Sequence, residues 1–304
     1  MIVQRKYAAI DIGSNAIRLL ISTITEQPGK PPVFKKTSLV RVPIRLGADV
    51  FIKGQISEEN ILRMVDALNA FRLLMRVHKI ERFRACGTSA MREAENGQQV
   101  VERLERETNL VVDIIDGSDE AAIIAATDLQ NLIKTEKTYL YVDVGGGSTE
   151  FTLYANAKTI ASKSFKLGSV RLLNESVPEE EWEQARMWVK ESTRSLGKID
   201  LIGSGGNINN IFKSSGKANG KPLSFLYLST YFDLLQSLTF EERITELNLN
   251  ADRADVIIPA TRIFLSAMNW SGARRIFVPK IGLADGIIRS LYQEDIAVPL
   301  KDQP

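Results

Sequence analysis

The sequence predicts an α/β protein of two domains, each built on a mixed β-sheet flanked by helices. Strands are expected first and are then followed by alternating strands and helices, which is typical of α/β domains. A strand–turn–strand pattern also occurs twice, at Lys6–Ser22 ("KYAAIDIGSNAIRLLIS") and at Thr138–Tyr154 ("TYLYVDVGGGSTEFTLY"). Because the chain has 304 residues, each of two halves has the size of an ordinary domain.

The first half, residues 1–125, is expected to form the N-terminal domain. Apolar and β-branched runs predict its strands, and apolar residues at helical spacing after an N-cap such as Ser57 predict its helices. The expected strands are Tyr7–Asp11, Ile17–Thr25, Lys35–Gly47, 82–87 and Leu110–Ile115. The expected helices are 58–79, a short one within 88–97, Gln98–Asn109 and Ser118–Ile133.

The second half, residues 126–304, repeats this scheme after a hinge expected near Lys134. Two strands flank the glycines at 145–147, and a third is expected within 159–170. Acidic residues directly after Pro178 favour the start of a helix there. The further expectations are helices at Pro178–Leu196, Ser229–Leu238, Phe240–Leu247 and Asp252–Asn269, and strand–turn–helix units at 199–212 and 274–292. The last helix is assigned to this half, with packing back on the first domain as the alternative.

The composition excludes several classes of function. The net charge of +2 gives no general attraction to nucleic acid or to a membrane. A single cysteine, Cys86, fits a reducing compartment, and a single histidine, His78, argues against a His-rich metal site and a Ser-His-Asp triad. No apolar run has the length of a membrane span. We therefore expect a cytoplasmic protein with neither nucleic acid nor a membrane as partner.

Three glycine-rich turns each follow an apolar strand: "DIGSN" (11–15), "DVGGGST" (143–149) and "GSGGN" (203–207). In such turns backbone N–H groups can point at a phosphate with no Cβ in the way. One turn alone is better explained as a β-hairpin that needs glycine for a positive φ. Three turns, two of them opened by Asp, favour phosphate binding. The spacings of a P-loop and of a dinucleotide-binding motif are both absent from the sequence.

The duplicated strand–Asp–glycine turn–strand unit resembles the actin-like superfamily of sugar kinases, acetate kinase and chaperone ATPases. Seven strings also resemble, in order, the motifs of the exopolyphosphatase / guanosine pentaphosphate phosphohydrolase family. They are "AAIDIGSNAIRLLI", "ACGTSAMREAENG", "IIDGSDEAAI", "VDVGGGSTEF", "KLGSVRLLNE", "LIGSGGNINNI" and "RADVIIPA". The resemblance covers nearly the whole chain. It implies a short form with two actin-like (ribonuclease H-like) domains and an active site in the interdomain cleft.

The resemblance also implies the chemistry and the residues that carry it. The expected enzyme depends on Mg²⁺, with Mn²⁺ as the alternative ion, and acts on a polyanionic phosphate substrate. Catalytic roles fall on Glu120, Asp143 and Arg92, and metal binding falls on Asp143 and Glu150. Phosphate binding falls on Asp11, Gly13, Ser14, Asn15, Thr88, Ser89, Gly145, Gly146, Gly147, Ser148, Arg171 and Gly205.

The residue types suit hydrolysis of a phosphoanhydride, which needs a bound phosphate, a neutralised charge and a positioned water. Carboxylates are ligands that Mg²⁺ prefers, and a carboxylate such as Glu120 can orient the water where no histidine is available. Each residue also has a structural explanation. Glu120 could stabilise a helix N-terminus, Asp143 could cap a turn, and Arg92 could pair with Glu93 or Glu95. Arg171 could contact substrate or brace the domain interface.

Four functions stay open at this point. The first is an exopolyphosphatase that releases terminal orthophosphate from inorganic polyphosphate. The second is a guanosine pentaphosphate (pppGpp) 5′-phosphohydrolase with the same catalytic loops. The third is a non-catalytic sensor of alarmone or polyphosphate, and the fourth is an ATP-dependent kinase. We favour polyphosphate because no nucleoside pocket is identifiable in the sequence. The oligomeric state is open, with a homodimer as one alternative.

Overall fold

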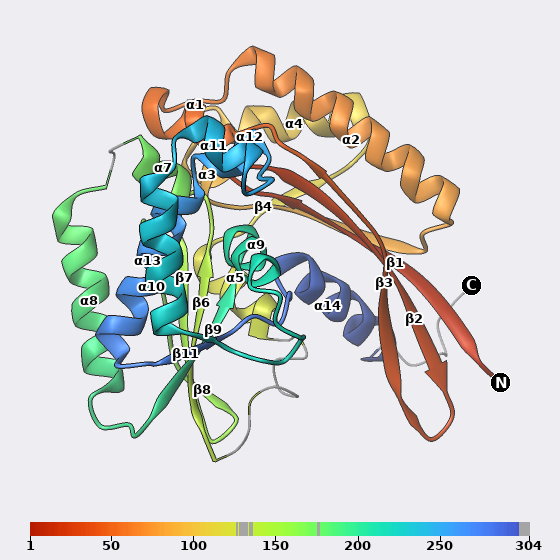
Figure 1. Ribbon diagram of the computed structural model, residues 1–304. Helices are drawn as coiled ribbons and strands as arrows, with labels where there is room; N and C mark the ends of the chain where they lie inside the picture. Colours follow the sequence, from red (N-terminus) through yellow and green to blue (C-terminus); the bar gives the residue numbers. More distant parts are fainter. Residues whose placement is uncertain (126, 128–132, 134–135, 175–176, 298–304) are drawn as a thin grey trace. The chain divides into compact units, whose positions relative to one another are not determined.

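The structure of the chain is a computed structural model that describes residues 1–125, 127, 133, 136–174 and 177–297 (Figure 1). It contains two compact units. Unit 1 comprises Met1–Thr127 together with the segment from Leu283 onward, and unit 2 comprises Asp128–Gly282. The boundary expected after residue 125 and the hinge expected near Lys134 stay predictions, because residues 126, 128–132 and 134–135 lie outside the described part.

Unit 1 is built on a five-stranded sheet with the strand order β3-β2-β1-β4-β5. Its strands are β1 (Val3–Ile12), β2 (Ile17–Gln27), β3 (Lys30–Val42), β4 (Arg82–Gly87) and β5 (Val112–Ile114). Its helices are α1 (Leu46–Lys53), α2 (Glu58–His78), α3 (Ser89–Glu93), α4 (Gly97–Thr108), α5 (Gly117–Ala125) and α14 (Leu283–Ala297). The first three strands are antiparallel, and β1, β4 and β5 are parallel.

The central strand β1 is buried on both faces, which explains its nearly unbroken apolar sequence. Ile10 and Ile12 belong to the core on one face, which includes side chains of α2 and α4. Tyr7 and Ala9 belong to a second core, to which α14 contributes. Figure 1 shows α14, in blue, beside β1 and β2. Helix α14, at the end of the described chain, thus covers one face of the sheet to which β1 belongs.

The approach of α14 to α5 is close enough to require a glycine. A Cβ added at Gly286 would lie 2.2 Å from the carbonyl oxygen of Ile123, far inside van der Waals contact. Ile123 lies one turn after Glu120 on α5. The helix that carries Glu120 therefore packs closely against α14.

The structure corrects one prediction in unit 1. The strand expected at Lys35–Gly47 ends at Val42, and the helix α1 begins at Leu46. Pro43 follows Val42 and has no N–H to donate to the sheet, so the strand ends there. The helix expected at Ser118–Ile133 is observed as α5 up to Ala125, and most of its remainder lies outside the described residues. The N-cap at Ser57 is confirmed, since its side chain accepts a hydrogen bond from the Asn60 amide.

Unit 2 is built on a six-stranded sheet with the strand order β10-β11-β9-β6-β7-β8. Its strands are β6 (Thr138–Val144), β7 (Thr149–Ala155), β8 (Lys158–Phe165), β9 (Ile199–Ser204), β10 (Leu223–Ser224) and β11 (Arg275–Phe277). Its helices are α7 (Ser169–Leu173), α8 (Glu179–Thr193), α9 (Gly206–Ser214), α10 (Phe225–Ser237), α11 (Phe240–Thr245), α12 (Ala251–Ala254) and α13 (Ile257–Ser271).

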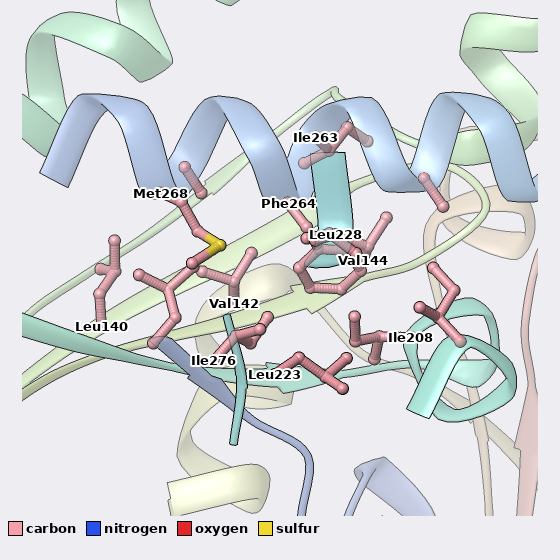
Figure 2. Packing of buried hydrophobic residues seen from close by; sticks show 14 of the residues in the cluster. Leu140, Val142, Val144, Ile208, Leu223, Leu228, Ile263, Phe264, Met268 and Ile276 are labelled. Atoms are coloured by element: carbon pink, nitrogen blue, oxygen red, sulfur yellow. The ribbon is translucent and has the colours of Figure 1, made fainter. Parts of the chain in front are cut away.

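The core of unit 2 forms where α13 packs on one face of β6 (Figure 2). Residues that alternate along a strand point to the same face, so Leu140, Val142 and Val144 all enter this core. Phe264 and Met268 of α13 belong to the same cluster and are fully buried. The opposite face of β6 carries Tyr139, Tyr141 and Asp143, which leaves the acid outside the apolar core.

Two further predictions differ from the structure in unit 2. The helix expected at Asp252–Asn269 is two helices, α12 and α13, with a break at Asp255–Val256. Pro259 explains the break, because it lacks the N–H that a continuous helix needs and is tolerated only in the first turn of α13. The sequence analysis also did not predict α7 and β10, which are short. None of the described helices combines the length and the apolar character that a transmembrane segment needs.

Candidate active site

Three predicted site loops of unit 1 lie at one edge of its sheet. The parallel strands β1, β4 and β5 end level with one another, with Ile12 opposite Gly87 and Gly87 opposite Ile114. The carboxyl ends of parallel strands form the edge where α/β proteins commonly bind ligands. The segments after these strands, with the last residues of β1, carry the predicted site residues: Asp11, Gly13, Ser14, Asn15 and Thr88 at strand ends and in loops, Ser89 and Arg92 on α3, and Glu120 on α5. Secondary structure alone thus brings together every site residue predicted in the first half.

The loop after β1 is a tight hairpin whose acid is already paired with a cation. The Gly13 amide donates to the Ala16 carbonyl at 3.2 Å and closes the turn. Asp11 is buried, and its Oδ2 lies 3.0 Å from Nη1 of Arg18 on β2. Burial raises the pKa of Asp11, and the charge of Arg18 opposes that rise. Asp11 is therefore paired with the positively charged Arg18.

The same loop is fixed from outside by the start of α1. The amide of Gly47 donates to the Ser14 carbonyl at 2.8 Å, and the amide of Arg45 donates to the Asn15 carbonyl at 3.1 Å. Arg45 has a left-handed conformation with φ of 62°, which is uncommon outside glycine. Ser14 and Asn15 are both buried. The backbone of this loop is thus held in a single shape.

The loop after β4 connects the two neighbouring loops. The Thr88 amide donates to the Ile12 carbonyl at 3.2 Å, which ties it to β1. The Arg92 guanidinium donates through Nη1 to the Ile115 carbonyl at 2.7 Å, which ties α3 to the start of α5. Thr88 and Ser89 are buried. Arg92 therefore makes this hydrogen bond within the predicted site.

Glu120 lies in the first turn of α5 and is only 9% exposed. The helix is capped by Asp116, whose Oδ1 accepts from the amides of Ser118 and Asp119, each at 2.8 Å. The same oxygen also accepts from the Ser118 hydroxyl. That hydrogen bond first, and then those of the two amides, lower the pKa of Asp116. Since Asp116 already caps the helix, Glu120 is not needed for that purpose, which weakens the structural explanation for its position.

The glycine loop of unit 2, Gly145–Gly147, is fixed by the short helix α7. The carbonyl of Gly145 accepts from the Ser169 amide at 3.0 Å, and that of Gly146 accepts from the Val170 amide at 2.9 Å. A Cβ added at Gly168 would lie 2.2 Å from the Gly146 oxygen, so only glycine permits this approach. The three carbonyls of the loop therefore face the segment 168–171.

The orientation of these carbonyls sets the orientation of the amides. In a planar trans peptide the N–H points away from the C=O, and the chain contains no cis peptide among its described residues. The amides of Gly146, Gly147 and Ser148 therefore point away from α7. Successive N–H groups that point in one direction form an anion-binding nest. The loop thus presents three backbone N–H groups on the side away from α7.

Arg171, expected to contact substrate or brace the domain interface, hydrogen-bonds to the glycine loop of its own unit. Its side chain is 8% exposed, and its Nε donates to the Gly147 carbonyl at 2.9 Å. The guanidinium thus fixes the third carbonyl of the loop, on the side opposite to the amides.

The third glycine turn, after β9, lies beside the second. β9 runs parallel to β6 with Ser204 opposite Asp143. Gly205 has φ of 107°, and a Cβ there would lie 2.7 Å from the Val144 carbonyl and 3.5 Å from Oδ1 of Asp143. The guanidinium of Arg253 covers Gly206 at the N-terminus of α9 and contacts the Asn207 side chain. This turn therefore adds a helix N-terminus and an arginine next to Asp143.

Two carboxylates face each other at the end of the β6–β7 hairpin. Asp143 and Glu150 are direct cross-strand partners, so their side chains lie on the same face of the sheet. Oε1 of Glu150 accepts from Ser148 Oγ at 2.6 Å and from Ser164 Oγ at 2.9 Å. Oδ2 of Asp143 accepts from the Tyr141 hydroxyl at 3.3 Å. Both acids are thus oriented by neutral hydroxyl donors beside the nest.

Comparison with known proteins agrees with this geometry. The model of the Ppx/GppA phosphatase family matches residues 24–294, which is most of the chain. The chain belongs to the Ppx/GppA phosphatase family. The predicted resemblance and the predicted enzyme class, a phosphoanhydride hydrolase, are thereby confirmed.

Relatives and solved structures of the family cover nearly the whole chain. Exopolyphosphatase 2 of Mycobacterium tuberculosis is 27% identical over 316 residues, which cover 94% of this chain and 98% of that protein. A bifunctional 3-dehydroquinate synthase/phosphatase of Fusobacterium nucleatum is 31% identical, but the match covers only 44% of its length. The crystal structure of the Aquifex aeolicus family member has a TM-score of 0.75 at 27% identity, over 96% of this chain and 99% of that one. The prediction of two actin-like domains is confirmed.

Enzymes of the Ppx/GppA family typically depend on a metal, and the donor set of unit 2 can be tested for this. Among the described residues, no cluster of three or more His, Cys, Asp and Glu side chains could hold a metal by itself. Mg²⁺ is commonly held by one or two carboxylates together with waters and substrate phosphates. The pair Asp143 and Glu150, beside an anion-binding loop, fits that pattern.

Sequence reasoning missed the residues that hold this family's site in shape. Gly168 supports the glycine loop, Arg18 pairs with Asp11, and Tyr141 and Ser164 orient the two acids of unit 2. Alternation along a strand could have found Tyr141, which is two residues before Asp143 and so shares its face. Hairpin register could have placed Arg18 opposite Asp11. Hairpin register could likewise have placed Ser164 opposite Glu150. Gly168 depends on a contact between separate segments, which no local pattern indicates.

Proposed function

We propose that this chain is an exopolyphosphatase, which releases terminal orthophosphate from inorganic polyphosphate in a Mg²⁺-dependent hydrolysis. The observation that carries the proposal is the glycine loop of unit 2, where an anion nest adjoins two oriented carboxylates. A chain of phosphates offers a terminal group for the nest and further oxygens for a cation.

Each residue has a part in the proposed reaction. The amides of Gly146, Gly147 and Ser148 bind phosphate oxygens, and the loops after β1 and β4 offer further donors through Ser14, Thr88 and Ser89. Asp143 and Glu150 would hold Mg²⁺ directly or through water, and the ion supplies neutralisation of the phosphate oxygens when it is bound. Glu120 orients the attacking water and accepts its proton.

The relatives support polyphosphate as the substrate. Two proteins named exopolyphosphatase, from Haemophilus influenzae and Mycobacterium tuberculosis, are covered by the match over 91% and 98% of their lengths. A guanosine-5′-triphosphate,3′-diphosphate pyrophosphatase of Aeromonas hydrophila is 25% identical, and the match covers 59% of it. Guanosine pentaphosphate is therefore the second candidate substrate, favoured by that relative.

The test is phosphate release from polyphosphates of several lengths, from guanosine pentaphosphate and from ATP, each with and without Mg²⁺. The variant Glu120→Gln is expected to lower the rate by about 10² to 10⁴, the usual contribution of a general base. Asp119→Asn is the matched control, because Asp119 lies exposed in the same helical turn. If Glu120→Gln lowers the rate no more than Asp119→Asn does, Glu120 only stabilises the helix and has no catalytic role. If no substrate is hydrolysed while phosphate compounds still bind, the chain is a sensor.

A further inference from the structure

We propose that Tyr141 is a positioning residue, which orients Asp143 for the cation of the reaction and thereby sets how tightly that cation binds. The inference rests on the proposed function, because it takes Asp143 as a ligand of Mg²⁺. It adds a residue for which neither the motifs nor the family comparison indicates a role.

The contact follows from the geometry of β6. Tyr141 precedes Asp143 by two residues, so both side chains lie on the face opposite the core formed by Leu140 and Val142. The Tyr141 hydroxyl donates to Oδ2 of Asp143 at 3.3 Å. Tyr141 is 1% exposed, so water does not compete for this bond. A buried phenol needs a polar partner, and here the acid and the Ser204 hydroxyl both lie within hydrogen-bond reach.

The second oxygen of Asp143 is left pointing elsewhere. A Cβ added at Gly205 would lie 3.5 Å from Oδ1, which places Oδ1 toward the turn after β9. One oxygen is thus occupied by the phenol, and the other faces the glycine turn at the N-terminus of α9. Such a division gives a metal ligand one defined orientation. Outer hydrogen bonds of this kind are typically worth 10-fold to 100-fold in metal affinity or activity.

Ser204 extends the arrangement to the neighbouring strand. Its Oγ donates to the Ile281 carbonyl at 2.8 Å, which fixes the hydroxyl beside Tyr141. In the register of β6 and β9, Ser204 lies opposite Asp143. The phenol is therefore held between Ser204 and Asp143. Tyr141→Phe would remove the hydroxyl and with it the hydrogen bond to Asp143.

The experiment compares Tyr141→Phe with Tyr139→Phe. Tyr139 lies on the same strand and the same face and is 3% exposed, so the control loses a hydroxyl from an equally buried tyrosine. Mn²⁺ binding is followed by the electron paramagnetic resonance signal of the free ion, in the presence of inorganic phosphate. Phosphate release is measured against Mg²⁺ concentration, and thermal unfolding is measured in EDTA to show that each variant is folded.

We expect Tyr141→Phe to weaken Mn²⁺ binding by about 10-fold to 100-fold and to raise the Mg²⁺ requirement in parallel, while the rate at saturating Mg²⁺ changes less. Tyr139→Phe is expected to behave like the unmodified chain. Equal Mn²⁺ affinity for the two variants would overturn the inference. In an Asp143→Asn background, Tyr141→Phe is expected not to raise the Mg²⁺ requirement of phosphate release any further, and a further rise there would show a merely structural role.

Asp143→Asn alone separates this inference from the proposed function. If it abolishes Mn²⁺ binding while Tyr141→Phe has no effect, the metal site stands and the role of Tyr141 is refuted. If Asp143→Asn leaves Mn²⁺ binding intact, the metal site itself is wrong, and the inference is refuted with it.

Discussion

The turn after β1 and the turn after β6 have nearly the same sequence pattern but different electrostatics. Both follow a buried strand, open with an aspartate and close a hairpin through a glycine amide. In unit 1 the aspartate contacts a guanidinium, that of Arg18. In unit 2 it contacts a phenol, that of Tyr141, and faces a second acid, Glu150. The internal repeat therefore keeps the strand–turn–strand pattern, while the side chain that contacts the aspartate differs between the two turns.

The largest expected effect tests this difference directly. Asp143→Asn is expected to raise the Mg²⁺ concentration needed for phosphate release by more than about 10-fold to 100-fold, because a ligand contributes at least as much as its outer partners. Asp11→Asn is expected to leave the Mg²⁺ requirement unchanged, since Asp11 pairs with Arg18. Titration of the phosphate-release rate with Mg²⁺ measures both. Equal shifts in the two variants would show that the turns share one role.

The next effect concerns how the glycine loop is supported. Gly168→Ala would force a Cβ against the Gly146 carbonyl and so displace the amides of the nest. A displacement of this kind can cost on the order of 10²-fold in rate, and overpacking costs about 1–3 kcal/mol of stability. Gly197→Ala is the matched control, because a Cβ there meets nothing within 4 Å. The rate of phosphate release and the urea unfolding of the two variants are measured side by side. Full activity of the Gly168→Ala chain would contradict the close fit between Gly168 and the glycine loop.

The smallest effect concerns stability and pH. Burial raises the pKa of Asp11 in the folded chain above its unfolded value of 3.8, although Arg18 opposes this. The folded state then holds the proton more tightly than the unfolded state, so the contribution of Asp11 to stability is present below the unfolded pKa and is lost as pH rises through the folded pKa. Relative to Asp11→Asn, the unmodified chain is expected to lose stability between acid and neutral pH.

Thermal unfolding of both chains across that range measures the difference. A gap between them that stays constant with pH, or one that changes in the opposite direction, would show that Arg18 outweighs burial at this site.

The local features of this fold were predictable because they depend on neighbours in sequence. The strands around Asp11 and Asp143 were identified from apolar runs, and Ser57 from its capping pattern. The failures have local causes too, since Pro43 ends β3 and Pro259 divides a long helix. What the sequence could not give is distance between segments. The Gly168 approach to the glycine loop and the Arg171 bond to the Gly147 carbonyl depend on how separate segments pack, and a motif does not encode that.

The helix α14 has a consequence for how the protein is made. Unit 2 is one continuous stretch of chain, so it is complete in sequence before the ribosome reaches Leu283. Unit 1 begins with the first residues of the chain but lacks α14 until then. Tyr7 on β1 therefore has no access to its hydrogen-bond partner Asp295 before α14 is synthesised. A premature stop codon or a proteolytic cut just before Leu283 would therefore strip the apolar face of β1 and β2, and would damage the unit that was synthesised first.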